Sequence, residues 1–318
     1  MSTLFIDTDL ESRAAWSTIT EPADAIAIAF TAALGHSAAL TELEHPKNAI
    51  QSLIDVDAAA DHTEAAAAIQ RWTPRLQSSA VSHALAAAAR DGIQLIDPSQ
   101  VPGLTDLGTR APHLIWLRGD AEALTRPIRS NVAMIGARAS SSYGDGVARE
   151  LSEQLVSSGV TIVSGAAYGI DGASHRAAME SGGTTVAWLA GGVDRPYPAG
   201  HRDLIDRIVE HGGAVASEVP PGATPTRWRF LGRNRLIAAA SAATIVVEAG
   251  YRSGALTTAT TAVMLGRALG AVPGRVDSPT SVMHSLHRCC PSYRVSQELR
   301  RGVDGGPISR SQWARRSS

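Results

Sequence analysis

A regular alternation of apolar runs and amphipathic segments between residues 131 and 275 is the feature that most restricts the fold of this chain of 318 residues. The runs NVAMIGA, VTIVSG, TTVAWLAGG, AVASEV, TIVVEAG and AVPG are almost continuously apolar, and glycine-rich turns and helix-like segments separate them. Strands that alternate with helices in this way are typical of a parallel sheet covered on both faces. The sequence therefore predicts an α/β fold, a doubly wound and mainly parallel Rossmann-like sheet.

The part of the chain before this alternation predicts a small all-helical domain. Residues 1–78 contain no strand-like run, and segments such as ADAIAIAFTAALGHSAAL carry apolar residues at helical spacing. Pro74 predicts the end of a helix, and GIQLI and HLIWLRGD predict short strands that join the main sheet. We expect a SAM-like helical domain over 1–78, an extended Rossmann-like domain over 79–302 and a flexible basic tail over 303–318.

The charges are distributed unevenly along the chain. Residues 1–125 contain 7 basic and 16 acidic residues, whereas the rest contains 22 basic and 14 acidic residues. A basic body predicts a polyanionic partner. Because Lys47 is the single lysine, cationic contacts to phosphate must come almost entirely from arginine, which binds phosphate bidentately and stacks on bases.

Composition also excludes several classes of protein. No apolar run reaches the roughly 18 residues that cross a bilayer, and the N-terminal MSTLFIDTDLESR carries acids where a signal peptide needs bases. We therefore expect a cytoplasmic protein with no membrane contact. The adjacent Cys289 and Cys290 fit neither a disulfide framework nor a Cys-x-x-Cys metal site, which predicts free thiols and no metal.

The first candidate site is the turn GARASSSYG, because ligands of an open parallel sheet bind beyond the carboxyl ends of its strands. Gly136 and Arg138 lie in this turn, and Arg138 projects from it. The turn lacks a complete G-x-G-x-x-G with a ribose-binding acid further on, so it gives dinucleotide binding little support. Taken alone, the string also fits an ordinary βα turn.

The second strand end, SGAAYGID, places Ser164 and Gly165 beside the start of a helix. Asp171 predicts a helix cap, and His175 predicts a buried, hydrogen-bonded histidine, although the pair also suits a metal or proton transfer.

At the third strand end, Arg195, His201 and Arg202 fit either the border of a phosphate groove or a solvated loop.

The strongest candidate is the string FLGRNRLI, residues 230–237. Arg233, Asn234 and Arg235 are expected at the start of an amphipathic helix, where two guanidinium groups, an amide and backbone N–H groups converge on an anion. The string VVEAGYRSGALTTA adds further donors at the start of another helix, and these are Ser253, Gly254 and Thr257. Glu248 fits an arginine-orienting carboxylate or, alternatively, a general base.

These strings together resemble the DprA/Smf family of DNA-processing proteins. The matching segments include VAMIGARASSSYG, VSGAAYGIDGASHRAAMESGGTTVAWLAGGVDRPYP, FLGRNRLIAAAS and VVEAGYRSGALTTA, and they follow in order through nearly all of residues 131–281. The resemblance implies a protein without catalytic turnover or cofactor that binds single-stranded DNA, forms a homodimer, and loads the recombinase RecA in natural transformation or recombination.

The resemblance also implies which residues contact DNA, and two departures from the family pattern. The implied contacts are Arg138, Ser164, Gly165, Arg233, Asn234 and Arg235, with Ser253, Gly254 and Thr257 lining the pocket. Residues 282–302 depart from the usual family text, and residues after 302 are too few for the winged-helix-like domain of many members.

Two other functions remain open. Nucleotide phosphoribohydrolases of the LOG type share this kind of domain, but their P-G-G-x-G-T-x-x-E string is absent from VVEAGYRSGALTTA. A nucleotide-binding sensor is the other alternative.

Overall fold

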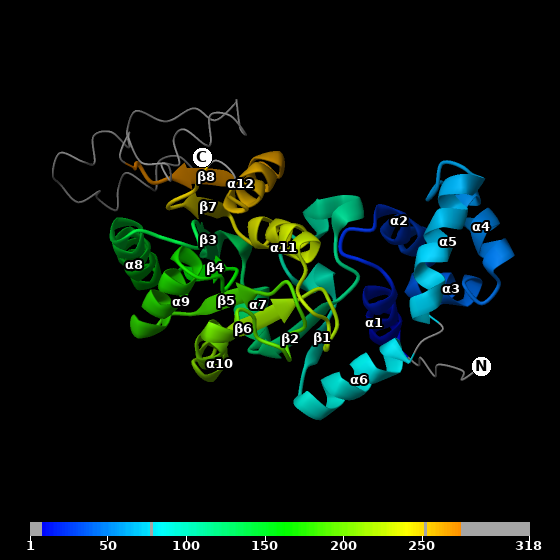
Figure 1. The fold of residues 1–318 in the computed structure, drawn as a ribbon, viewed down its shortest axis with the longest axis horizontal. Coiled ribbons are helices and arrows are strands. Elements are labelled where there is room, and N and C mark those ends of the chain that lie inside the picture. Colours follow the sequence, from blue (N-terminus) through cyan, green and yellow to red (C-terminus); the bar gives the residue numbers. More distant parts are fainter. Residues whose placement is uncertain (1–7, 77–78, 251–252, 275–318) are drawn as a thin grey trace.

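A computed structural model describes residues 8–76, 79–250 and 253–274 (Figure 1). Its centre is an eight-stranded sheet with the strand order β1-β2-β6-β5-β4-β3-β7-β8. The six strands from β6 to β8 in this order are parallel, and β2 and β1 continue the sheet in antiparallel pairing. The strands are β1 (Gln94–Ile96), β2 (Ile115–Gly119), β3 (Asn131–Ile135), β4 (Thr161–Ser164), β5 (Thr185–Trp188), β6 (Ala214–Ser217), β7 (Ala243–Val246) and β8 (Ala268–Ala271). The predicted doubly wound sheet and its two added strands are confirmed.

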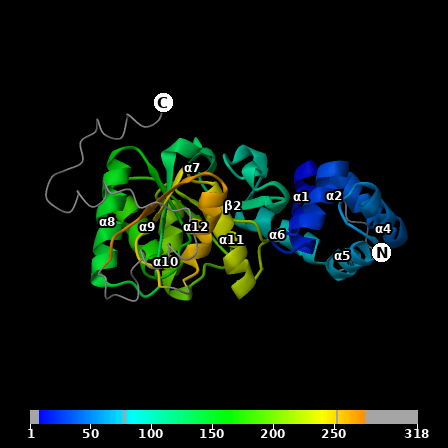
Figure 2. The same cartoon turned by 90° about the horizontal axis from the view of Figure 1, so that it is seen from above.

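Helices cover both faces of the sheet, as Figures 1 and 2 show. On one face, α7, α11 and α12 pack on the side chains of Ile135, Val163 and Trp188. On the other face, α8, α9 and α10 pack on alternate strand residues such as Met134 and Val215. Side chains of a strand point alternately to the two faces, so two apolar cores form on one sheet. These helices are α7 (Ala121–Thr125), α8 (Ser142–Ser157), α9 (Ile170–Glu180), α10 (Arg202–Glu210), α11 (Arg227–Ala239) and α12 (Ala255–Met264).

Six further helices precede the sheet and lie beside its β1 end (Figure 1). Their core is aromatic: the indole of Trp16 packs edge-on against Phe30 and Trp72, with ring centroids 6.2 and 5.4 Å away. The all-helical N-terminal part is as expected. The helices are α1 (Asp9–Ile19), α2 (Ala25–Leu34), α3 (His36–Glu42), α4 (Pro46–Asp55), α5 (His62–Leu76) and α6 (Ala80–Asp91).

One local prediction was confirmed to within two residues, and another was wrong. Pro74 was predicted to break the helical pattern before the next helix, and it lies in the last turn of α5, which ends at Leu76 before α6 begins at Ala80. The last strand, expected at 271–274, is β8 at Ala268–Ala271. The turn that ends α12 contains Gly266 in a left-handed conformation (φ 67°), which reverses the chain early enough for Ala268 to pair with Ala243 of β7.

No single helix in the described ranges has both the length and the apolar character needed to cross a membrane, whereas α2 and α3, bent by 108° to each other, meet these criteria only as a pair. The expected thiols Cys289 and Cys290, the altered segment 282–302 and the tail 303–318 lie outside the described residues.

Candidate nucleic-acid interface

The carboxyl ends of β3, β4 and β5 form a rim with the first half of α11. Arg138 follows β3, Gly165 follows β4, and Tyr197 lies in the loop after β5. Arg138 is exposed, and its guanidinium carbon lies 4.7 Å from the ring centroid of Phe230 on α11. The Tyr197 and Phe230 rings are 5.6 Å apart. The rim therefore combines a cation and two aromatic rings, the kind of group that suits phosphate and base together.

Arg233 lies buried beneath this rim, against the ends of β4 and β5. Its side chain is 4% exposed, and Nη1 donates hydrogen bonds to the carbonyl oxygens of Gly165, at 2.8 Å, and Trp188. Burial lowers the pKa of Arg233 to about 10, against the attraction of Asp171, so the guanidinium still carries its charge at neutral pH. Arg233 lies 5.9 Å from the Phe230 ring centroid, and its charge adds to that of Arg138.

Gly165 is required by this arrangement. A Cβ atom at this position would lie 2.5 Å from Nη1 of Arg233. Ser164, also predicted to contact DNA, is fully buried and donates to the carbonyl oxygen of Met134 at 2.6 Å. Ser164 therefore shapes the strand end from inside instead of facing a ligand, which corrects its predicted contact.

Asn234 connects α11 to the start of α12. Its Nδ2 donates to the carbonyl oxygen of Gly254, at 3.0 Å, and to Oγ1 of Thr257, at 2.9 Å, while its Oδ1 accepts from Nε of Arg233 at 3.2 Å. Ser253 lies beside them, and its Oγ accepts from the N–H of Ala255 at 3.3 Å. The structure thus brings Asn234, Ser253, Gly254 and Thr257 together where α11 contacts α12.

The start of α11 differs from the prediction. The helix begins at Arg227, with the side chain of Thr226 accepting a hydrogen bond from the N–H of Arg229. Arg233 and Asn234 therefore lie in the second turn, where backbone N–H groups are bonded within the helix. The proposed convergence of helix N–H groups on an anion at these residues was wrong. The signal for the true start was the N-cap residue Thr226, four residues before Phe230.

Arg235 does not reach the rim. Its guanidinium is fully buried and forms a two-pronged ion pair with Glu218, both N···O distances being 2.6 Å. Nε also donates to the carbonyl oxygen of Arg110 at 2.7 Å. With its charge paired and four of its five N–H groups bonded inside the protein, this buried group cannot reach a phosphate, so the predicted DNA contact of Arg235 is corrected to a structural ion pair.

Within the described residues, Glu248 contacts a serine and not an arginine. Its carboxylate accepts from the N–H of Ser141, at 2.9 Å, and from its hydroxyl, at 2.5 Å. Ser141 is the N-cap of α8, so Glu248 fixes the turn that follows β3. A Cβ at Gly144 would lie 2.4 Å from Oε2 of Glu248, and one at Gly136 would lie 2.6 Å from Ile170. These glycines permit the close packing behind Arg138.

Asp171 and His175 are internal. Asp171 accepts from the N–H groups of Gly165 and Ala167, at 3.2 and 3.3 Å, and α9 has Gly169 at its N-cap instead. Burial raises the pKa of Asp171, partly opposed by the charge of Arg233.

His175 is the predicted buried histidine: its Nδ1 lies 2.7 Å from Oγ1 of Thr185, and burial lowers its pKa to about 3. His175 is therefore neutral and structural.

The three candidate residues after the third strand differ in their burial. His201 is buried and Nδ1 donates to the carbonyl oxygen of Ala166 at 3.0 Å, whereas Arg195 and Arg202 are exposed. No group of three or more histidine, cysteine or acidic side chains within the described residues is placed to hold a metal ion.

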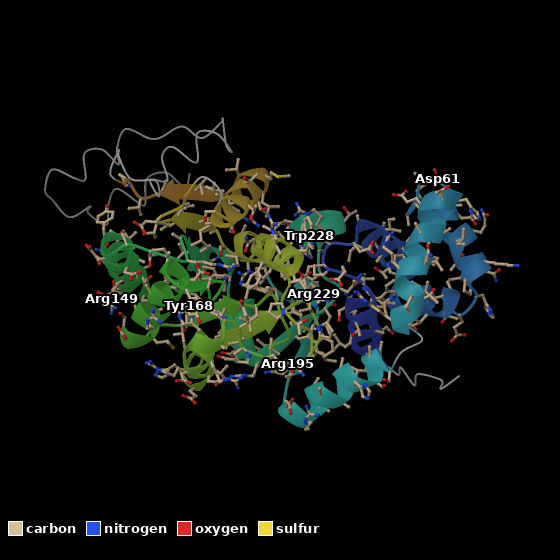
Figure 3. The ribbon with its side chains drawn as sticks, in the orientation of Figure 1. Asp61, Arg149, Tyr168, Arg195, Trp228 and Arg229 are labelled. Carbon is tan, nitrogen blue, oxygen red and sulfur yellow. The ribbon has the colours of Figure 1, made fainter. Side chains whose placement is uncertain are left out.

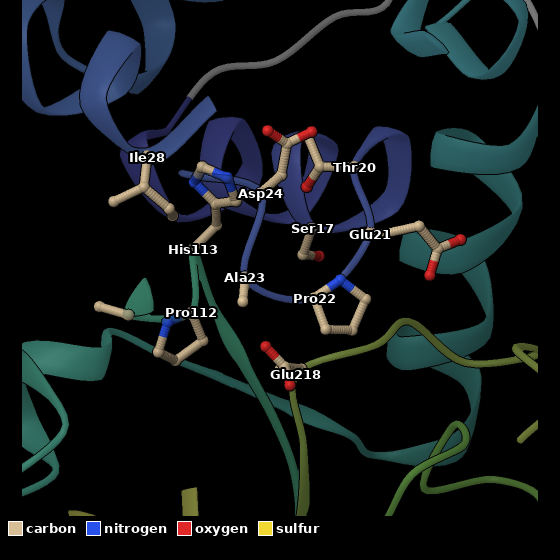
Figure 4. A pocket seen from close by; sticks show the side chains of 11 residues that line it. Ser17, Thr20, Glu21, Pro22, Ala23, Asp24, Ile28, Pro112, His113 and Glu218 are labelled. Atoms are coloured by element: carbon tan, nitrogen blue, oxygen red, sulfur yellow. The ribbon is translucent and has the colours of Figure 1, made fainter. Parts of the chain in front are cut away.

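A small cavity lies away from the rim, between the α1–α2 loop and the loop after β6 (Figure 4). Its volume of about 10 Å³ is that of a single water molecule. His113, whose Nε2 lacks a hydrogen-bond partner among the described residues, lines it together with Asp24 and Glu218. The cavity is too small for a nucleotide, so the rim is the candidate site.

Fold and rim together define a Rossmann-like α/β protein with arginine and aromatic side chains at the carboxyl edge of its sheet. The model of the family described as DNA recombination-mediator protein A matches residues 93–288. The chain belongs to this family.

Relatives with curated names agree with this assignment. The chain is 51% identical over 179 residues to a putative DNA processing protein DprA of Mycobacterium tuberculosis, covering 56% of this chain and 46% of the relative. It is 39% identical over 184 residues to protein Smf of Escherichia coli, covering 58% and 47%. It is 34% identical over 213 residues to DNA processing protein DprA of Bacillus subtilis, covering 66% and 69%. The chain thus spans about half the length of the first two relatives.

Solved structures share the fold. The X-ray structure of DNA processing protein A from Streptococcus pneumoniae superposes with a TM-score of 0.68 at 24% identity, over 95% of this chain and 99% of that one. A structure of DNA processing protein A from Helicobacter pylori, described for its unique single-stranded DNA binding mode, superposes with a TM-score of 0.56 at 24% identity, over 67% of this chain and 96% of that one.

Proposed function

We propose that the chain binds single-stranded DNA at the rim and acts in DNA processing without catalytic turnover. The observation that carries the proposal is the pair Arg138 and Phe230. Arg138 is exposed, has no acidic partner among the described residues, and lies 4.7 Å from an aromatic ring. Such a group can bind a phosphate and leave a ring edge for a base, with no requirement for a particular sequence.

The contact set that we propose is narrower than the one predicted from sequence. Arg138 binds phosphate directly, Arg233 adds charge from below, and Asn234 holds the two helices that form the pocket wall. Gly254 and Thr257 are exposed on that wall and offer polar groups to the strand. Ser253 helps to shape that wall, and Gly165 leaves the space that the Arg233 side chain occupies.

The wider role follows from the family. We propose that the protein acts in the cytoplasm as a homodimer and loads RecA on single-stranded DNA during natural transformation or recombination. In this proposal, residues 79–302 form the DNA-binding domain, and residues 1–78 form a separate helical domain. RecA nucleation on DNA coated with a single-strand binding protein tests this role. It should accelerate with wild-type protein and not with Arg138→Ala.

Fluorescence anisotropy of labelled oligo-dT across a salt series tests DNA binding itself. Affinity should fall steeply with salt, by a log–log slope of about −0.7 for each phosphate contact on a single strand. Double-stranded DNA of equal length and a free mononucleotide serve as competitors. Equal competition by the mononucleotide would favour the nucleotide sensor, and release of free base from it would favour the hydrolase. Absence of oligo-dT binding at low salt would overturn the proposal.

A further inference from the structure

A third aromatic ring lies near the rim, and the proposed contact set does not use it. Tyr168, in the turn between β4 and α9, is 47% exposed, and Tyr197 is 46% exposed. Figure 3 shows Tyr168 beside α9, separated from the α11 residues Trp228 and Arg229, which lie on the side of the N-terminal helices. All three tyrosines among the described residues are exposed, and aromatic residues make up 4% of the sequence.

The ring of Tyr168 is held in a fixed position. It packs edge-to-face against the ring of His201, with centroids 4.8 Å apart and an interplanar angle of 71°. His201 is itself buried and bonded to the carbonyl oxygen of Ala166. Tyr168 is therefore anchored by its edge while half of its surface faces solvent, and little side-chain entropy remains to be lost on stacking.

Glycines make this anchoring possible. A Cβ at Gly200 would lie 2.6 Å from the hydroxyl oxygen of Tyr168, and a Cβ at Gly172 would lie 2.5 Å from Cε1 of His201. The Tyr168 hydroxyl has no hydrogen-bond partner within the described residues, so the ring is not positioned to satisfy that group. What the arrangement does provide is an exposed aromatic surface at a defined place.

A single loop joins this ring to the proposed DNA site. The segment between β5 and α10 carries Tyr197, which lies 5.6 Å from Phe230 by ring centroids, and four residues later His201, which contacts Tyr168. One face of Phe230 is already covered by the guanidinium of Arg138. The more exposed rings, Tyr197 and Tyr168, therefore continue the same edge of the sheet from α11 toward α9.

We propose that Tyr168 is a second base-stacking position, so that a bound strand runs from Phe230 across the Tyr197 loop to the turn after β4. This inference rests on the proposed single-stranded DNA binding and adds the direction of the strand. Arg202, which is exposed and directly follows His201, supplies a positive charge near Tyr168. A flexible, anionic strand with bases free to stack is the partner that fits alternating rings and guanidinium groups.

Oligo-dT affinity of the Tyr168→Ala and Tyr168→Phe variants tests the position. Loss of one stacked base costs roughly 1–3 kcal/mol, or about five- to a hundredfold in affinity, so Tyr168→Ala should lose that much and Tyr168→Phe should stay within about twofold of wild type. Tyr143→Ala is the matched control. Tyr143 is 55% exposed at the start of α8, and its hydroxyl donates to the carbonyl oxygen of Pro273, which follows the edge strand β8.

A scan with single abasic sites separates stacking from an indirect effect on folding. In wild type, removing the base that stacks on Tyr168 should weaken binding, and in Tyr168→Ala the same removal should cost nothing further. Additive losses at every position, or a loss in Tyr143→Ala as large as in Tyr168→Ala, would overturn the proposed path. If Tyr168→Ala binds normally while Arg138→Ala does not, only this inference fails. If wild type does not bind oligo-dT, the proposed function fails with it.

Discussion

The two faces of α11 that carry Arg233 and Arg235 use arginine in opposite ways. Arg233 donates to backbone carbonyl oxygens at the strand ends and forms no ion pair within the described residues, although the charge of Asp171 acts on it. Arg235, on the opposite face, forms a two-pronged ion pair with Glu218, and Arg229, one turn before Arg233, forms another with Glu21, both distances being 3.0 Å. The helix string RWRFLGRNR therefore contains guanidinium groups of two kinds, and only the first kind keeps charge for a polyanion.

The two ion pairs explain how the helix is held. Glu218 follows β6, whereas Glu21 lies in the loop between α1 and α2, so the sheet and the N-terminal helices each hold α11 through one pair. Gly232 lets the helix approach Pro22, since its Cβ would lie 3.2 Å from Cβ of Pro22. We infer that the two pairs fix the helix in the position in which Phe230 and Arg233 reach the rim.

The largest effect is expected from breaking the buried pair. Arg235→Met leaves the Glu218 carboxylate buried without its partner, which should cost about 3–5 kcal/mol of unfolding free energy. Urea denaturation measures this loss. The double variant Arg235→Met/Glu218→Leu should recover most of it, because both charges are then absent. Normal stability of Arg235→Met combined with weak DNA binding would show that Arg235 belongs to the rim after all.

The opposite result is expected for Arg138. Arg138→Ala should weaken oligo-dT binding by about tenfold or more and reduce the salt slope by about 0.7, since one phosphate contact is lost. Its unfolding free energy should change by less than about 0.5 kcal/mol, because the side chain is exposed. Anisotropy and urea denaturation on the same sample measure both. A loss of stability without a loss of affinity would mean that Arg138, like Arg235, stabilises the fold and does not bind DNA.

Gly165 offers a smaller and more local test of the rim side. Gly165→Ala places a methyl group within 2.5 Å of Nη1 of Arg233, which must then shift. Because Arg233 stands behind Arg138 and Phe230, oligo-dT affinity should fall severalfold without removal of any charge. Gly146→Ala is the control, since a Cβ at that position in α8 meets nothing within 4 Å. Equal affinity of the two variants would show that the position of Arg233 does not affect DNA binding.

Much of the fold and part of the rim could be predicted from the sequence. The alternation of strands and helices predicted the parallel sheet, and the rule that strand carboxyl ends share one edge placed Arg138, Gly165 and Arg233 near one another. The fate of individual charges could not be predicted in this way. Arg235 meets Glu218 from 17 residues away, and Arg229 meets Glu21 from 208 residues away. Such pairs depend on how loops pack after folding, and nothing in the local string RNR distinguishes Arg233 from Arg235.

The smallest expected effect concerns the exposed ion pair that joins α11 to the N-terminal helices, in which Glu21 is the acid. Burial tends to raise the pKa of Glu21, but the hydrogen bonds from Arg229 and Arg75 outweigh it and hold that pKa below 4.5. A carboxyl with a lowered pKa adds stability above its unfolded-state pKa and loses it as pH falls through the folded-state value. The Glu21 side chain is half exposed, so Glu21→Gln should cost no more than about 1 kcal/mol at pH 7. The difference between variant and wild type in urea denaturation should shrink as the pH falls below the unfolded-state pKa of Glu21. A difference that persists in acid would mean that Glu21 holds α11 by packing and not by its charge.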